Sequence, residues 1–65
     1  MTQEEFDYVR WRKGMRAKVF IEGMGTVIGV RFDKSLVIVR LDKEPINRRE
    51  FPATLVTLME EDKNV

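Results

Sequence analysis

Leu36-Val37-Ile38-Val39-Arg40-Leu41 is the stretch that decides the fold of this chain. Its β-branched side chains lose rotamer freedom in a helix and pack well on a pleated surface, so a strand is predicted over residues 35–41. Because successive side chains of a strand point to opposite faces, Val37, Val39 and Leu41 share one wholly apolar face. We therefore expect this face to be buried in the core.

The same period of two predicts further strands on both sides of this stretch. Strands are expected over residues 15–21, 26–32, 46–51 and 55–59. The inward positions of the first strand are Met15, Ala17, Val19 and Ile21, and its outward positions are Arg16, Lys18, Phe20 and Glu22. Either Leu55 or Val56 is expected to close one end of the core.

Short polar or glycine-containing segments separate these strands. The breaks are expected at Glu22-Gly23-Met24-Gly25, Asp33-Lys34 and Asp42-Lys43-Glu44-Pro45. Gly29 lies inside a strand pattern, where glycine commonly marks a bulge or a sharp bend. Pro52 cannot donate to a ladder, and Pro52-Ala53-Thr54 suits one helical turn before the last strand.

The first residues follow a different pattern. Thr2 and Glu5 have the spacing of a capping box, which predicts a short helix over about residues 2–10. Such a short helix is marginal alone, so it would dock by Phe6, Val9 and Trp11. The alternative is an extended arm that lies along the strands.

Length and composition limit the class of protein. The chain has 65 residues, which is one domain, and it contains no Cys and no His, so disulfides and His/Cys zinc sites are excluded. Its acidic, polar start does not resemble a secretory signal, and no run reaches the ~20 apolar residues of a membrane span. We expect a soluble cytoplasmic protein that does not bind membranes.

Charge is distributed unevenly along the chain. The net charge is +1, but residues 10–49 carry +7 whereas residues 1–9 and 50–65 each carry −3. The net charge by itself indicates no partner, but a basic middle between acidic ends is a clear asymmetry.

Four segments together resemble a known family of small β domains. They are Gly14-Met15-Arg16-Ala17-Lys18-Val19, Gly25-Thr26-Val27-Ile28-Gly29-Val30, Val37-Ile38-Val39-Arg40-Leu41-Asp42 and Phe51-Pro52-Ala53-Thr54-Leu55-Val56. The pattern resembles SH3-like barrels of the KOW and Tudor-like type, found in bacterial nucleic-acid and transcription machinery. The resemblance implies an all-β, five-stranded SH3-like barrel over residues 14–59, with a helix or arm over 1–13, a one-turn helix before the last strand and an acidic tail over 60–65.

Basic side chains interspersed with aromatic rings are the first candidate site. The residues expected to bind nucleic acid are Arg10, Trp11, Arg12, Lys13, Arg16, Lys18, Arg48 and Arg49. Guanidinium and ammonium groups bind phosphates, and an exposed aromatic ring offers bases a stacking surface. The alternative is that these residues are solvated strand faces, whose charges keep edge strands from pairing with other chains.

A surplus of apolar side chains is the second candidate site. The residues expected at a protein interface are Phe20, Met24, Val27, Leu36 and Ile38. Met24 would form an apolar tip that enters a partner or plugs the end of the barrel. The alternatives are that residues 1–12 cover this patch, that both faces of the sheet are buried, or that a second copy forms a homodimer.

Catalysis is not expected, because no carboxylate lies on an apolar face and the chain has no His or Cys. Residues 46–56 occupy the place of the pore-lining strand in the plasmid-encoded dihydrofolate reductases, which resemble this chain in size and barrel type. That family's Val-Gln-Ile-Tyr motif would fall on Arg48-Arg49-Glu50-Phe51 and is not there.

The sequence thus predicts a non-enzymatic binding module of a bacterium, phage or mobile element, without cofactor, metal or small-molecule substrate. Its expected partner is nucleic acid or a protein of the nucleic-acid machinery. The alternative is a protein–protein adaptor or host-directed inhibitor that acts through the apolar patch.

Overall fold

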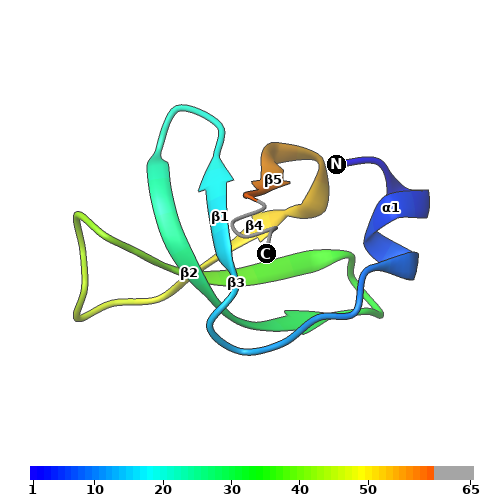
Figure 1. Cartoon of the computed structure of the whole chain (residues 1–65), viewed down its shortest axis with the longest axis horizontal. Helices are drawn as coiled ribbons and strands as arrows, with labels where there is room; N and C mark the ends of the chain where they lie inside the picture. Colours follow the sequence, from blue (N-terminus) through cyan, green and yellow to red (C-terminus); the bar gives the residue numbers. More distant parts are fainter. Residues whose placement is uncertain (60–65) are drawn as a thin grey trace, which may run out of the picture.

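The computed structural model describes residues 1–59 and consists mainly of one antiparallel β-sheet (Figure 1). Five strands are ordered β4-β3-β2-β1-β5 across the sheet. The elements are α1 (Gln3–Tyr8), β1 (Arg16–Val19), β2 (Gly23–Arg31), β3 (Leu36–Leu41), β4 (Arg49–Pro52), the 3-10 helix η1 (Ala53–Leu55) and β5 (Val56–Leu58). The predicted acidic tail, 60–65, lies outside the described residues. Among residues 1–59, no helix has the length and apolar character needed to cross a bilayer.

One small core lies against a single face of this sheet. The buried hydrophobic residues are Phe6, Ala17, Val19, Val27, Val37, Val39, Leu41, Phe51, Ala53 and Val56. The predicted inward face of β3 is confirmed, since its three apolar residues are at most 1% exposed. Val56 rather than Leu55, which is 39% exposed, closes the end of the core.

The long strand β2 contains a bulge that changes which of its side chains reach the core. Val27 pairs with Val39, but the next pair is Gly29 with Ile38, so the register shifts between them. The irregularity predicted at Gly29 is thereby confirmed. The prediction that Val27 belongs to an exposed apolar patch is wrong, because pairing with the inward-facing Val39 places Val27 in the core, fully buried. Figure 1 shows β2 curving from the β1 hairpin toward the side where α1 lies.

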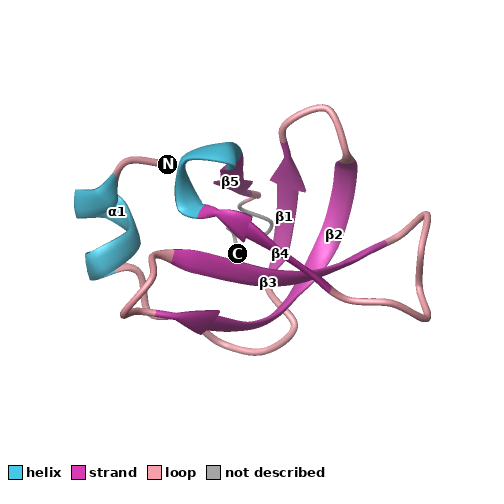
Figure 2. Ribbon diagram, turned by 180° about the vertical axis from the view of Figure 1, so that it is seen from behind, coloured by secondary structure: helices cyan, strands magenta, loops and turns pink. Residues whose placement is uncertain are grey.

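The N-terminal residues form a helix rather than an extended arm. The Thr2 hydroxyl accepts from the amide of Glu5 at 3.1 Å, and the Glu5 carboxylate accepts from the amide of Thr2 at 2.9 Å, which is the predicted capping box. Phe6 is fully buried, and its ring centroid lies 5.4 Å from that of Phe32. The Met1 ammonium donates to two backbone carbonyls at η1 and the start of β5. Figure 2 shows α1 beside this turn.

The connection between β1 and β2 comes earlier than the sequence pattern predicts. Val19 pairs with Gly23, so the chain reverses over residues 20–22, and the Glu22 amide donates to the Val19 carbonyl at 3.0 Å. Ile21, expected inside, is 80% exposed with a φ of 57°. Met24, expected at the tip, lies within β2 opposite Lys18 and is half-buried. Both expectations are wrong because the strand ends at Val19.

Candidate functional site

A row of polar side chains crosses the outward face of three strands. Arg16 of β1 pairs with Thr26 of β2, and Thr26 pairs with Arg40 of β3. Val39 and Arg49 form the last pair of β3 with β4, and extending this antiparallel register by one residue would bring Arg48, directly before β4, opposite Arg40. Sequence reasoning missed Arg40 as a site residue, although its outward position on β3 follows from the same period of two that buried Val39.

The segment between α1 and β1 adds cations beside this row. The Gly14 amide donates to the carbonyl of Val27 at 2.9 Å, and the Val27 amide donates to that of Met15 at 2.7 Å. These bonds hold the segment alongside β2. The basic residues that precede it are exposed: Arg10, Arg12 and Lys13.

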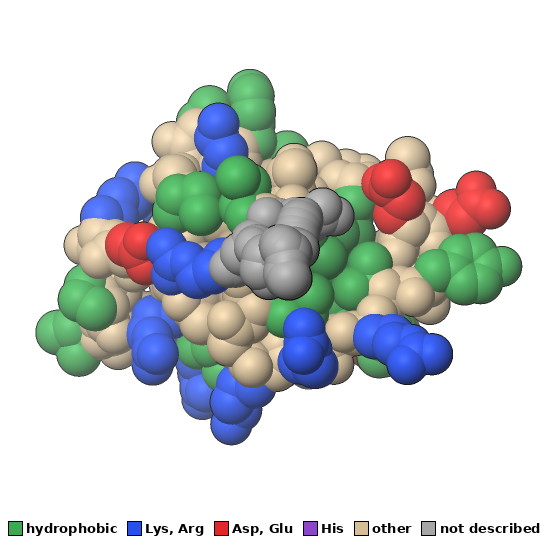
Figure 3. Space-filling view, in the orientation of Figure 1, with side chains coloured by type: hydrophobic (Ala, Val, Ile, Leu, Met, Phe, Trp, Pro, Cys, Tyr) green, Lys and Arg blue, Asp and Glu red, His purple; other side chains and the backbone are tan. Residues whose placement is uncertain are grey.

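Five of these cations have no carboxylate partner in the described part of the chain. They form what we call the basic face: Arg10, Arg12, Lys13, Arg40 and Arg48. None of them makes an ion pair within residues 1–59. Figure 3 shows lysine and arginine side chains along the lower part of the molecule and also at its upper left, with acidic side chains near α1 at the right and one at the left.

Two of the predicted phosphate-binding arginines have structural partners instead. The Arg16 guanidinium donates to both carboxylate oxygens of Asp42, at 3.1 and 2.6 Å, and to the Thr26 hydroxyl at 2.7 Å. The Arg49 guanidinium lies 3.6 Å from a Glu22 oxygen and 3.7 Å from a Glu44 oxygen. Both arginines tie strands to loops through these carboxylates.

Trp11 is not the exposed stacking ring that the sequence suggested. It is half-buried, and its ring centroid lies 5.6 Å from that of Phe6. Its indole N–H donates to the Phe6 carbonyl at 3.0 Å, close to the C-terminal end of α1. Trp11 therefore helps to cover the core and to hold the helix, and the prediction that it stacks on bases is corrected accordingly.

An ion-pair network fixes the β1–β2 turn. Glu22 lies 3.0 Å from the Lys43 ammonium and also contacts Arg49. The hydrogen bond from Lys43, and then its positive charge, lower the pKa of Glu22, with a smaller contribution from Arg49. At the neighbouring pair, the hydrogen bond from Arg16 lowers the pKa of Asp42. Glu22 thus connects the turn to the β3–β4 loop and to β4.

The predicted apolar patch does not form as one surface. Leu36 and Ile38 are half-buried on the outward face of β3, near the ion pair in which Arg31 donates to Glu50 at 2.7 Å. Phe20, 65% exposed, lies at the opposite end of the sheet, in the β1–β2 turn. Val27 belongs to neither group, because its pair with the inward-facing Val39 places it in the core.

A different set of apolar side chains gathers at that turn. We call it the apolar turn: Phe20, Ile21, Met24 and Leu55. The amide of Phe20 donates to the carbonyl of Leu55 at 2.8 Å, so β1 and η1 meet here. Lys18, whose paired neighbours are Met24 and Thr57, lies beside this set and forms no ion pair within residues 1–59. The sequence pattern did not predict that Ile21 and Leu55 belong to this surface. It placed Ile21 at an inward position of a strand, and it did not decide whether Leu55 or Val56 closes the core.

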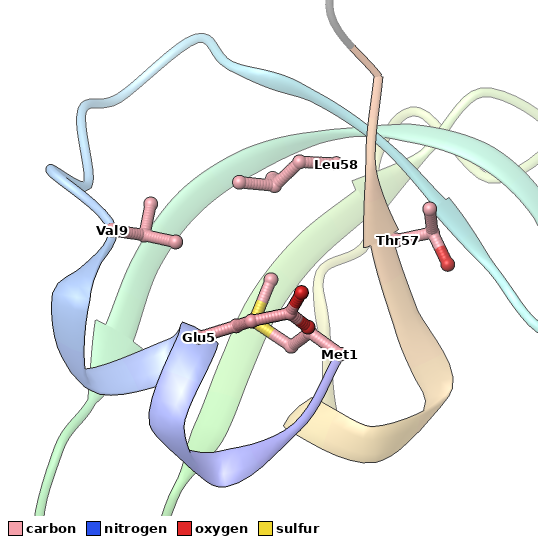
Figure 4. Close-up of a pocket in the computed structure, with 5 residues that line it drawn as sticks. All are labelled: Met1, Glu5, Val9, Thr57 and Leu58. Atoms are coloured by element: carbon pink, nitrogen blue, oxygen red, sulfur yellow. The ribbon is translucent and has the colours of Figure 1, made fainter.

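A pocket of about 290 Å3 lies between α1 and β5 (Figure 4). It is lined by Met1, Glu5, Val9, Thr57 and Leu58. Its one carboxylate, Glu5, already accepts the capping hydrogen bond from Thr2. Within residues 1–59, no group of three or more acidic, His or Cys side chains is placed to hold a metal ion. The residues that line the pocket therefore indicate no catalytic or metal-binding role.

Comparisons with protein-family models, with curated proteins and with solved structures found no match to this chain. Function is accordingly inferred from the surfaces of the protein itself.

Proposed function

We propose that this protein is a non-enzymatic module of the SH3-like barrel type that binds nucleic acid through its basic face. The barrel is supported by the connection between the two edge strands. The three residues of η1 join β4, at one edge of the sheet, to β5, at the other. A 3-10 helix rises ~2 Å per residue, so three residues span only about 6 Å, which favours a sheet that curls until its two edges are close.

The observation that carries the proposal is a pair of arginines without ion pairs at the end of the contact between β3 and β4. Arg40 and Arg48 are the residues directly beyond the last pair of β3 with β4, Val39 with Arg49, and neither has an ion pair within residues 1–59. Like charges directly opposite each other on neighbouring strands are destabilising. A bound polyanion would remove this repulsion, and three further cations of the basic face extend the surface along the neighbouring segment.

The chemistry of the face favours contacts with the phosphate backbone over recognition of bases. Arginine and lysine neutralise phosphates whatever the sequence, whereas specificity requires contacts to base edges. The one tryptophan is half-buried against Phe6, and the exposed ring of Tyr8, two residues before Arg10, could stack on any base without sequence preference. We therefore expect binding with little sequence preference, at about micromolar affinity or weaker at physiological salt.

The test is fluorescence anisotropy with labelled single-stranded and duplex oligonucleotides at about 50 and 200 mM salt. Binding should weaken steeply between these two conditions. The double variant Arg40→Ala/Arg48→Ala should bind more weakly and reduce the slope of log K against log salt by ~2, about one per lost phosphate contact. Arg40→Lys/Arg48→Lys keeps both charges and should retain most of the salt slope.

The matched control is Lys34→Ala, which removes an exposed cation that lies in the β2–β3 turn and is not one of the five residues of the basic face. It should leave affinity and slope unchanged. Circular dichroism should show that all variants are folded. Absence of binding at the lower salt, or equal affinity of the wild type and the double alanine variant, would refute the proposal.

A further inference from the structure

Ile21 adopts a backbone conformation that its side chain disfavours. Its φ is 57°, in the left-handed region, and its side chain is 80% exposed. Residues other than glycine rarely adopt this conformation, and a β-branched residue there is a genuine outlier. The next glycine, Gly23, has a φ of 104° and open space around its Cα, as a turn of this kind requires. Glycine or asparagine would thus suit position 21 better than isoleucine.

The surrounding contacts hold the turn in place but do not use the isoleucine side chain. The Glu22 amide donates to the Val19 carbonyl, and the Glu22 carboxylate pairs with Lys43 and Arg49. None of these bonds involves the side chain of Ile21. Backbone strain of this kind persists where neighbouring structure enforces it, and it is concentrated at functional sites. The fold therefore presents an apolar side chain to solvent from a firmly held turn.

The residues around Ile21 form a surface that combines apolar side chains with one positive charge. Phe20 is 65% exposed and Leu55 is 39% exposed, and a backbone hydrogen bond joins them. Met24 is half-buried opposite Lys18, whose ammonium group has no carboxylate partner within residues 1–59. The surface is thus apolar, with one uncompensated cation beside it.

We propose that the apolar turn is a docking surface for a protein partner, whose apolar pocket carries a carboxylate that pairs with Lys18. Ile21, Met24 and Leu55 carry no ring and offer bases no stacking surface, which leaves Phe20 as the one aromatic ring of the set. This composition favours a protein over nucleic acid. The inference is independent of the basic face, which lies on other residues.

Charge complementarity argues against a second copy of this chain as the occupant. A homodimer through the apolar turn would bring two Lys18 ammonium groups to one interface. The adjacent acidic residue, Glu22, is already paired with Lys43 and Arg49, so it offers them no free partner. A membrane is also disfavoured, because interfacial binding scales with buried apolar area and Phe20 and Ile21 are the only two members of this surface that are mostly exposed.

The probe for the test is a library of random 12-residue peptides displayed on phage and selected on the folded protein. Selected peptides should combine apolar residues with Asp or Glu. Synthetic copies should lose at least tenfold in affinity for Ile21→Asn, because the anchor is removed. Ile21→Asn should also raise the thermal midpoint, since asparagine tolerates the left-handed conformation. A combined gain in stability and loss of binding is not expected of a merely structural residue.

The matched control is Ile46→Asn, which makes the same change at an exposed isoleucine in the β3–β4 loop. It should leave peptide affinity unchanged. Lys18→Glu should weaken binding of the acidic peptides, and peptides with Lys in place of the acidic residue should bind Lys18→Glu better than the wild type. This reciprocal exchange would locate the peptide carboxylate at Lys18.

Four results would overturn the inference. The first is selection of peptides that bind Ile21→Asn as well as the wild type. The second is Ile21-dependent binding to vesicles of phosphatidylserine and phosphatidylcholine in place of peptides. The third is a dimer in sedimentation that Ile21→Asn converts to a monomer. The fourth is loss of oligonucleotide binding in Ile21→Asn, which would assign this surface to nucleic acid.

Discussion

Gly25 is the position where a single added carbon should damage the core most clearly. It is buried in β2 and pairs with Leu41 of β3. A Cβ added there would lie 2.5 Å from the Cγ1 of Val39, 2.8 Å from the carbonyl oxygen of Arg40 and 3.1 Å from the Cα of Leu41. Two of these atoms belong to the backbone of β3, so they yield only if the strands separate.

The expected magnitude follows from this geometry. Extra carbons forced into a packed core cost typically ~1–3 kcal/mol, occasionally more, and a clash with backbone belongs to the upper part of that range. The core of so small a domain supplies only ~3–5 kcal/mol. Because 1 kcal/mol shifts the midpoint of a 60–100-residue domain by about 4–8 °C, Gly25→Ala should lower it by on the order of 10 °C or more.

Gly29→Ala is the matched control on the same strand. Its added Cβ would meet only the Cδ1 of Ile38, at 3.8 Å, which is ordinary van der Waals contact. Because alanine restricts the unfolded chain more than glycine does, this change should be neutral or stabilising by up to ~1 kcal/mol. Thermal and urea unfolding followed by circular dichroism measure both variants. Equal midpoints for Gly25→Ala and the wild type would show that β2 and β3 do not pack as described.

Three further predictions concern the core and the ion pairs. Val39→Ala should cost ~1–3 kcal/mol in urea unfolding through lost burial and a cavity, and an unchanged urea midpoint would contradict its place in the core. Phe6→Ala should lower the free energy of unfolding by ~3–5 kcal/mol and reduce the helical circular dichroism signal. Loss of the helical signal without a lower midpoint would show that the packing of α1 does not stabilise the core. Since their folded pKa values are lowered, Glu22 and Asp42 stabilise the fold above about pH 4, and this contribution is lost as the pH falls through the folded values. Acid titration of Asp42→Asn should show a smaller loss of stability below pH ~4 than the wild type, and an identical acid titration curve would refute the role of the Arg16 pair.

The candidate sites were only partly foreseeable from the chain. The exposed cations at Arg10, Arg12 and Lys13 follow from their position in a polar connecting segment. The compensation of Arg16 could not be read from the sequence, because Asp42 is 26 residues away and reaches it only across β2. The apolar turn could not be predicted for the same reason. The sequence pattern assigned Phe20 and Ile21 to one strand, Met24 to the following turn and Leu55 to the last strand.

The sequence by itself was sufficient to predict a feature wherever one short segment contains all the interacting groups. The capping box needs only Thr2 and Glu5, and the alternation of β-branched residues in β3 is enough to predict that Val37 and Val39 share a buried face. Each of these features depends on residues at most a few positions apart.

Tertiary structure decided the features that depend on pairing between strands. The β1–β2 turn begins after Val19 because Val19 pairs with Gly23, and Val27 is buried because the bulge lies beyond its pair with Val39. A period of two continues in the sequence whether or not a partner strand is present. Where a strand ends, and which face it turns to the core after a bulge, therefore depends on hydrogen bonds and packing with residues far along the chain.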